Sequence, residues 1–149
     1  MAKGDTVPNV GIWEKRMFAG PERDRLLIRE LIDSYGDAVA MRDADAWGAC
    51  WAEDAVWRFA GRELAGREAI VATWHGAMAR YADLAFMAFP GAMAVEGDRA
   101  TLRTHTFEHL VPVDGPTRVQ AGIYEDELVR RDGRWLFASR TFNPREIKQ

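Results

Sequence analysis

The stretch AVEGDRATLRTHTFEHL, residues 94–110, decides the fold. Gly97 and Asp98 are turn residues between two runs that alternate side chains with a period of two, which is typical of a β-hairpin. Successive side chains of a strand point to opposite faces, so Arg103, His105, Phe107 and His109 share one face of the second run. We therefore predict an antiparallel pair of strands with two of the chain's three histidines on one face.

The same alternation continues to the end of the chain. Strand-like runs cover residues 84–97, 99–113, 117–131 and 134–142. The separators EGDR, VDGP and RDGR each combine Gly with Asp, which favours tight turns. These four runs predict an antiparallel meander.

Helical patterns dominate the first half of the chain. From Pro21 onward, apolar residues recur at spacings of three and four, and a short helix over 44–51 and a third over 66–81 follow. Residues 54–61 between them read as a strand, with a turn or hairpin at 61–66. Helices first and strands after predict an α+β fold, in which three helices cover one face of a curved, mixed or antiparallel sheet.

Length and composition fit one soluble domain. The chain has 149 residues, of which 48% are hydrophobic and 29% charged, with a net charge of −3 and no basic stripe. These values argue against nucleic acid and membrane as partners. A single cysteine and no signal-like N-terminus favour the cytoplasm. We predict one domain over 22–149, preceded by an irregular arm, 1–21, that packs through Trp13, Met17 and Phe18.

The predicted proton-transfer groups are His109 and His105, because imidazole titrates near neutral pH. Tyr35 lies on the apolar stripe of the first helix, so its hydroxyl points inward and can hold a substrate oxygen. Tyr124 is a second candidate of this kind. The spacing of the two histidines on a strand, about 13 Å, is too long for one metal ion. The predicted walls of the binding pocket are aromatic: Trp57, Phe59, Trp74, Phe86 and Phe89.

Three motifs carry a resemblance to a known family: WAEDAVW at 51–57, GREAI at 66–70 and RRDGRWLFASRTF at 130–142. In this order the chain resembles the SnoaL-like branch of the nuclear transport factor 2-like superfamily, over residues 24–142. The resemblance implies a cone, in which a strongly bent sheet holds an apolar pocket under its helices. Bends of this kind need bulges or glycines, for which Pro90-Gly91 and Gly122 are candidates.

The superfamily includes scytalone dehydratase and bile-acid dehydratase, and the resemblance to them is incomplete. Tyr35 matches a first-helix tyrosine of the bile-acid enzyme, and His109 falls near its acid–base position on the long strand. In contrast, Ala40 stands where these enzymes carry an aspartate and Phe59 where they carry a tyrosine. The segment LAFMAF, 84–89, offers no histidine. The usual dehydratase dyad is therefore missing.

We expect a lyase or isomerase that acts on an apolar, aromatic or polycyclic small molecule without metal or organic cofactor. His109 would move the proton, His105 would assist, and Tyr35 and Tyr124 would hold the oxygen on which charge develops. Two alternatives remain: a non-catalytic small-molecule-binding protein, and a structural partner such as the small subunit of an oxygenase complex. We also expect a homodimer or homotrimer.

Overall fold

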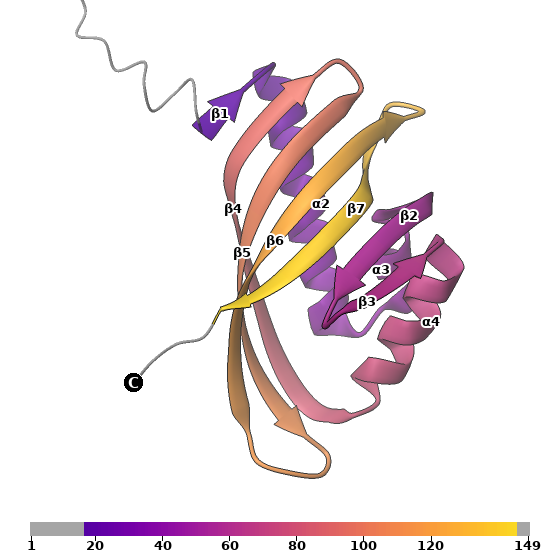
Figure 1. The fold of residues 1–149 in the computed structure, drawn as a ribbon, viewed down its shortest axis with the longest axis vertical. Coiled ribbons are helices and arrows are strands. Elements are labelled where there is room, and N and C mark those ends of the chain that lie inside the picture. Colours follow the sequence, from indigo (N-terminus) through magenta and orange to yellow (C-terminus); the bar gives the residue numbers. More distant parts are fainter. Residues whose placement is uncertain (1–16, 146–149) are drawn as a thin grey trace, which may run out of the picture.

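The computed structural model describes residues 17–145 and has the predicted α+β architecture (Figure 1). Within these residues, one curved, unclosed sheet has the strand order β1-β4-β5-β6-β7-β2-β3. Residues 1–16, including Trp13, and 146–149 lie outside the described part.

The predicted meander forms the body of the sheet. Its strands are β4 (Tyr81–Glu96), β5 (Arg99–Pro112), β6 (Arg118–Arg131) and β7 (Arg134–Arg145), and each neighbouring pair is antiparallel. Gly97 and Gly133 in the turns adopt positive φ values of 58° and 74°, where glycine is favoured. The Gly-Asp separators were therefore correctly interpreted as turns.

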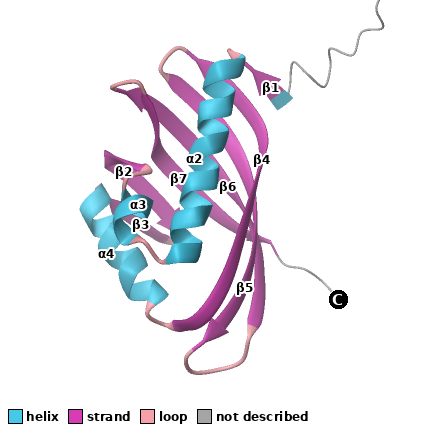
Figure 2. Cartoon of the chain, turned by 180° about the vertical axis from the view of Figure 1, so that it is seen from behind, coloured by secondary structure: helices cyan, strands magenta, loops and turns pink. Residues whose placement is uncertain are grey.

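Three helices cover one face of the sheet (Figure 2). The long helix α2 (Glu22–Met41) follows Pro21 and carries Glu22 and Asp24 in its first turn, where acidic side chains stabilise the helix dipole. Helix α4 (Arg67–Met78) and the short helix α3 (Ala44–Gly48) complete the layer. Helix α3 ends earlier than predicted, because Trp51 already belongs to the next strand.

The strands between the helices extend the sheet beyond β7. Strand β2 (Trp51–Phe59) pairs with β7 in parallel and with β3 (Arg62–Ala65) in a hairpin. This arrangement makes the sheet mixed, and it brings the aromatic side chains of β2 under helices α3 and α4.

The end of the predicted arm is more regular than expected. Residues Phe18–Ala19 form the short strand β1, which pairs in parallel with Met93 and Ala94 of β4. Gly20 then turns the chain into α2 with φ 99°, and a Cβ atom there would lie 2.5 Å from the carbonyl oxygen of Val95. Only glycine fits this close approach without strain.

Aromatic rings fill the space between helices and sheet. The indoles of Trp47 and Trp74 stack with their centroids 4.6 Å apart, and Trp51 lies 5.3 Å from Trp47. Tyr35 of α2 contacts this cluster and also Phe137 of β7. Aromatic pairs of this kind stabilise a core beyond the area that they bury, so the cluster fixes the helices relative to the sheet.

The sheet bends at one of the two predicted positions. The pairing of β4 with β5 shifts its register between Pro90 and Met93, which marks an irregularity at Pro90-Gly91. Gly122 has a different role. A Cβ atom there would lie 2.2 Å from the ring of Phe142, so this glycine makes room for the ring.

None of the helices within residues 17–145 is both long and apolar enough to cross a bilayer.

We predict that Gly122→Ala destabilises the fold by about 1–3 kcal/mol, because the new methyl group collides with the Phe142 ring. Urea denaturation measures the change. The matched control is Gly76→Ala in α4, where nothing lies within 4 Å of the added atom. It should leave stability unchanged or raise it by up to about 1 kcal/mol. Equal effects of the two variants would contradict the packing role of Gly122.

Candidate active site

A partly open cavity lies between the inner face of the sheet and helices α2 and α4. Its volume is about 190 Å³. Most of its lining is apolar, and the polar groups are one carboxyl, one amide, the tyrosine hydroxyls and two indole N–H groups. The lining residues with polar groups are Tyr35, Trp57, Trp74, Tyr81, Glu108, Gln120 and Tyr124.

The only carboxyl group in this lining belongs to Glu108 on β5. Its strand neighbours are Phe86 on β4 and Gln120 on β6, both of which also line the cavity. Burial raises the pKa of Glu108 to about 7, and the charge of Arg118 partly opposes this rise. Glu108 can therefore both accept and donate a proton near neutral pH, as acid–base catalysis requires.

The histidines lie on the opposite face of the same strand. His105 and His109 are exposed on the outer face of β5, whereas Thr104, Thr106 and Leu110 are buried under the helices. The predicted two-residue alternation is correct, but the prediction that the imidazoles face the cavity is wrong. Two imidazoles in bulk solvent, on the far side of the sheet, cannot reach a substrate in the cavity.

A signal for the correct face was present in the sequence. Ala100, Leu102 and Leu110 share the parity of Glu108, whereas Arg99 and Arg103 share that of the histidines. A face with leucines packs against helices more readily than one with arginines. This comparison would have assigned Glu108 to the inside.

Tyr35 and Tyr124 both line the cavity, as predicted from their patterns. Burial raises the pKa of Tyr124 to about 12, and it raises that of Tyr35 well above the ordinary value. Both hydroxyls therefore stay protonated at neutral pH. They can donate hydrogen bonds to a ligand oxygen, but they are poor proton donors in a full transfer.

A buried ion pair lies behind the two tyrosines. The Nε and Nη2 atoms of Arg140 donate to the carboxylate of Asp126 at 2.8 and 3.1 Å, and the hydroxyl of Thr104 donates to the same carboxylate at 3.0 Å. The guanidinium carbon lies 3.9 Å from the ring centroid of Tyr124 and 4.6 Å from that of Tyr35. Arg140 was not predicted as a site residue, because its sequence neighbourhood resembles that of any other charged residue in a strand.

Four of the five aromatic residues that were predicted as pocket walls line this cavity. Trp57, Phe59, Trp74 and Phe86 line the cavity. Phe89 does not, since it lies on the outer face with 58% of its surface exposed. Positions 86 and 89 differ by an odd number, so on one strand they point to opposite faces.

The site also contains unpaired hydrogen-bond donors. Among the described residues, the buried indole N–H groups of Trp47, Trp51 and Trp57 and the Nη1 atom of Arg140 have no hydrogen-bond partner. Trp57 lines the cavity, so its N–H group is a further donor near a bound molecule. An unpaired buried donor is costly, and a ligand with an acceptor atom would reduce this cost.

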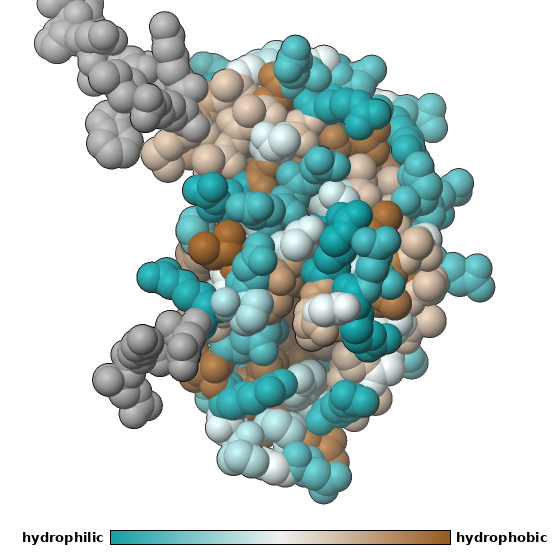
Figure 3. Space-filling view, in the orientation of Figure 1, coloured by the Kyte–Doolittle hydropathy of each residue, from teal (hydrophilic) through white to brown (hydrophobic). Residues whose placement is uncertain are grey.

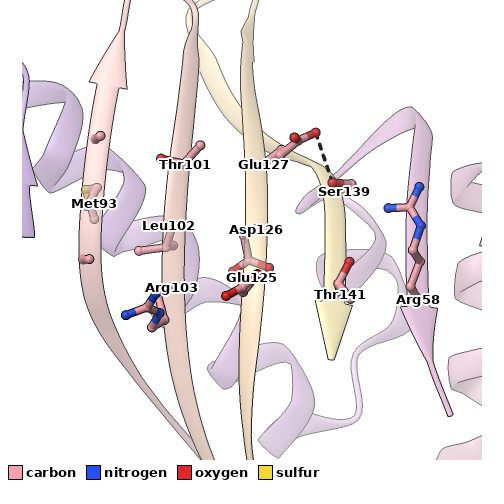
Figure 4. A pocket seen from close by; sticks show the side chains of 12 residues that line it. Arg58, Met93, Thr101, Leu102, Arg103, Glu125, Asp126, Glu127, Ser139 and Thr141 are labelled. Atoms are coloured by element: carbon pink, nitrogen blue, oxygen red, sulfur yellow. Dashed lines mark hydrogen bonds between the residues drawn. The ribbon is translucent and has the colours of Figure 1, made fainter. Parts of the chain in front are cut away.

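A larger hollow of about 530 Å³ lies on the outer face of the sheet (Figure 4). Its side chains form cross-strand rows, among them Arg103 beside Glu125 and Ser139 beside Glu127. The hollow is lined mainly by polar and charged side chains and is more open to water, which screens charges and weakens electrostatic catalysis. We therefore place the candidate active site in the smaller, more apolar cavity.

The described residues offer no obvious metal centre. Residues 17–145 contain no group of three or more His, Cys, Asp or Glu side chains that could hold an ion. Cys50 is buried, and burial raises the pKa of its thiol to about 11, so it is not a reactive nucleophile at neutral pH.

Solved structures with the same fold define the class of protein. An NTF2-like protein with a cystatin-like fold from Novosphingobium aromaticivorans matches with a TM-score of 0.69 and 31% identity over 80% of each chain. A candidate scytalone dehydratase from the same bacterium gives 0.77 at 19% identity over 83% of this chain and 85% of that one. A hexachlorocyclohexane dehydrochlorinase (LinA, type 2) gives 0.73 at 21% over 83% and 90%. The protein is thus an NTF2-like cone.

Within this class, the family is also clear. The model of the SnoaL-like domain matches residues 22–141, so the chain belongs to the SnoaL-like domain family. A search of curated protein sequences finds no match.

We predict that Asp126→Asn destabilises the protein by roughly 3–5 kcal/mol, because the charge of Arg140 is then left buried without its counter-ion. Chemical denaturation at neutral pH measures this loss. The control is Glu63→Gln, which breaks the exposed pair with Arg58 and should change stability little. If both variants lose equally little, the buried pair does not support the fold as described.

Proposed function

We propose that the protein is a cofactor-independent lyase or isomerase in which Glu108 moves a proton on a small, mainly apolar ring compound. The observation that carries this proposal is a carboxyl group with a pKa of about 7 inside an apolar cavity. A dehydratase-like and a dehydrochlorinase structure share the fold, which supports chemistry of the elimination type.

The size of the cavity limits the substrate. A closed apolar cavity of about 150 Å³ holds one benzene molecule, and pockets for drug-sized ligands measure about 300–1,000 Å³. At about 190 Å³ the cavity suits a single six-membered ring with small substituents. Of the two substrate classes expected from the sequence, this volume favours a monocyclic molecule over a polycyclic one.

The chemistry can be written with one carboxyl group. The carboxylate of Glu108 takes a proton from a ring carbon, the electron pair of that C–H bond forms the new double bond, and the bond to a neighbouring hydroxyl breaks. Glu108 then returns its proton to the departing hydroxyl, which leaves as water. Isomerisation needs a ring that already carries a double bond beside the C–H group. The electron pair of the C–H bond then shifts that double bond, no other bond to the ring breaks, and Glu108 returns its proton to the far carbon of the original double bond. In both cases the hydroxyls of Tyr35 and Tyr124 stabilise the developing charge by hydrogen bonds.

We predict that Glu108→Gln lowers turnover by about 10²–10⁴-fold, which is the usual contribution of general acid–base catalysis. The assay screens hydroxylated and halogenated six-membered rings for loss of water or halide and for double-bond migration. His105→Ala and His109→Ala are the matched controls. Both change outer-face residues of the same strand and should retain turnover.

Two results would count against this mechanism. Full activity of Glu108→Gln would remove Glu108 from the chemistry, and loss of activity in His109→Ala alone would favour the histidine. Saturable tryptophan quenching by these ring compounds without any turnover would favour the alternative of a binding protein.

The pH dependence of catalysis has a defined sign. A base must be deprotonated to act, so kcat/KM should rise with pH through about 7 and then level off. A pH–rate profile of the active protein checks this expectation. A rise centred near the ordinary glutamate value would indicate that Glu108 is not the base.

The folded state itself provides an independent check. Because the folded pKa of Glu108, about 7, lies above the ordinary 4.5, the folded protein loses stability as pH rises between these values. Glu108→Gln removes this penalty, so the variant should be more stable than the parent above pH 7 and equal to it below about pH 4.5. Thermal unfolding at both pH values then shows that lost turnover is not lost folding.

We also propose that copies of this chain associate through the outer face of the sheet. Four large apolar side chains are exposed there: Met87, Phe89, Phe107 and Val119. They occupy neighbouring strands, since Met87 pairs with Phe107 and Val119 with His109. Figure 3 views this face, where apolar side chains lie among polar ones. The adjacent opposite charges of Arg103 and Glu125 can face their opposites on a second copy related by a two-fold axis.

We expect Phe89→Glu to shift the solution mass toward the monomer, because a carboxylate would be buried in the contact. Light scattering after size exclusion measures the mass. The control is Leu26→Glu, an equally exposed apolar side chain on α2, which should not change the mass. A parent protein that is already monomeric at high concentration would exclude this association.

A further inference from the structure

An arginine that the proposed mechanism does not use lies beside the lining residues Tyr81 and Leu110. Arg118 begins β6 and pairs in register with the buried Leu110, so it lies on the inner face of the sheet one step beyond Gln120. Its Nη2 atom donates to the hydroxyl of Tyr81 on β4 at 3.0 Å. The bond crosses β5 and holds a guanidinium next to a tyrosine that lines the cavity.

A second guanidinium is fixed to the same tyrosine. Arg42, just after α2, donates from Nη1 to the carbonyl oxygen of Met78 at 3.1 Å and from Nη2 to that of Tyr81 at 2.8 Å. Within residues 17–145, neither Arg42 nor Arg118 forms an ion pair with a carboxylate. The chain has a net charge of −3, so two guanidinium groups without an ion-paired carboxylate are a local feature, and Glu108 is the carboxyl on which the charge of Arg118 acts.

The groups that surround Glu108 are otherwise uncharged. Tyr35 of α2, Tyr81 of β4 and Tyr124 of β6 line the cavity with it, while α4 and β2 contribute only apolar or indole side chains. Arg140 of β7 is paired with Asp126. The exposed Arg118 guanidinium can therefore meet a ligand, since only one of its nitrogen atoms donates within the described residues.

We propose that, beside the cavity, Arg118 and the Tyr81 hydroxyl form an anion subsite, which binds the carboxylate of a small ring acid whose ring occupies the cavity. The inference rests on the proposed function only in that the substrate uses the same cavity. A carboxylate matches the planar guanidinium and accepts hydrogen bonds from it and from the hydroxyl. The ring of such an acid would extend past Leu110 toward Glu108.

Binding of the anion has a consequence for the proton on Glu108. The positive charge of Arg118 favours the carboxylate form of Glu108. A bound carboxylate offsets that charge, so proton uptake by Glu108 and anion binding favour each other. Substrate acids would therefore bind more tightly below pH 7 than above it, whereas neutral ring compounds would show a weaker dependence.

The test compares benzoate with benzamide, which have the same ring but differ in charge. Quenching of tryptophan fluorescence at pH 6 reports binding, since Trp57 and Trp74 line the cavity. We expect benzoate to bind about tenfold more tightly than benzamide. Arg118→Met should reduce this preference to within about twofold and leave the affinity for benzamide unchanged. Arg103→Met, on the outer face, is the matched control and should keep the preference.

Several results would overturn the subsite: equal affinities of the parent for both compounds, no saturable binding of benzoate, or an equal loss of both ligands in Arg118→Met. The proposed function fails separately, by unchanged turnover in Glu108→Gln. In this binding assay Glu108→Gln should retain its preference for benzoate, because the variant still carries Arg118 and Tyr81.

Discussion

The arrangement of this protein depends on the fact that helices cover only one face of its sheet. Side chains of β5 alternate between the two faces, so each residue of that strand belongs either to the cavity or to the solvent. Leu102 and Leu110 are buried on the face that the helices cover. Glu108 lies on the same face, because its position differs from theirs by an even number of residues. The same rule carries His105 and His109 outward. One geometric constraint thus determines which titratable group lies near a ligand.

Burial then determines the chemical character of the site. It raises the pKa of Glu108 into the neutral range, and it keeps the hydroxyls of Tyr35 and Tyr124 protonated. The ion pair of Arg140 with Asp126 lies under both tyrosine rings, where it compensates a charge that would otherwise be costly to bury. The proposed mechanism therefore assigns proton transfer and hydrogen-bond donation to different side chains.

The surroundings of the cavity fit the amphipathic ligand that we propose. Aromatic rings form much of the lining, whereas one lining residue, Tyr81, accepts hydrogen bonds from the guanidinium groups of Arg42 and Arg118. In this proposal the ring of the ligand contacts the aromatic side chains and its carboxylate contacts Arg118. The outer face of the sheet, with its exposed aromatic and charged rows, is available for contact with another copy of the chain.

The sequence alone determined the elements of the fold, since periodicity and Gly-Asp turns are local properties. The meander, the helical layer, the SnoaL-like resemblance, and Tyr35 and Tyr124 as cavity residues could all be predicted from it. Only the tertiary structure decided which face of β5 the helices cover. It therefore decided that Glu108, and not the two histidines, lines the cavity. It also decided that Arg140 is buried and that Arg118 meets Tyr81, 37 positions away. Such contacts depend on how distant strands pack together, and no local pattern encodes them.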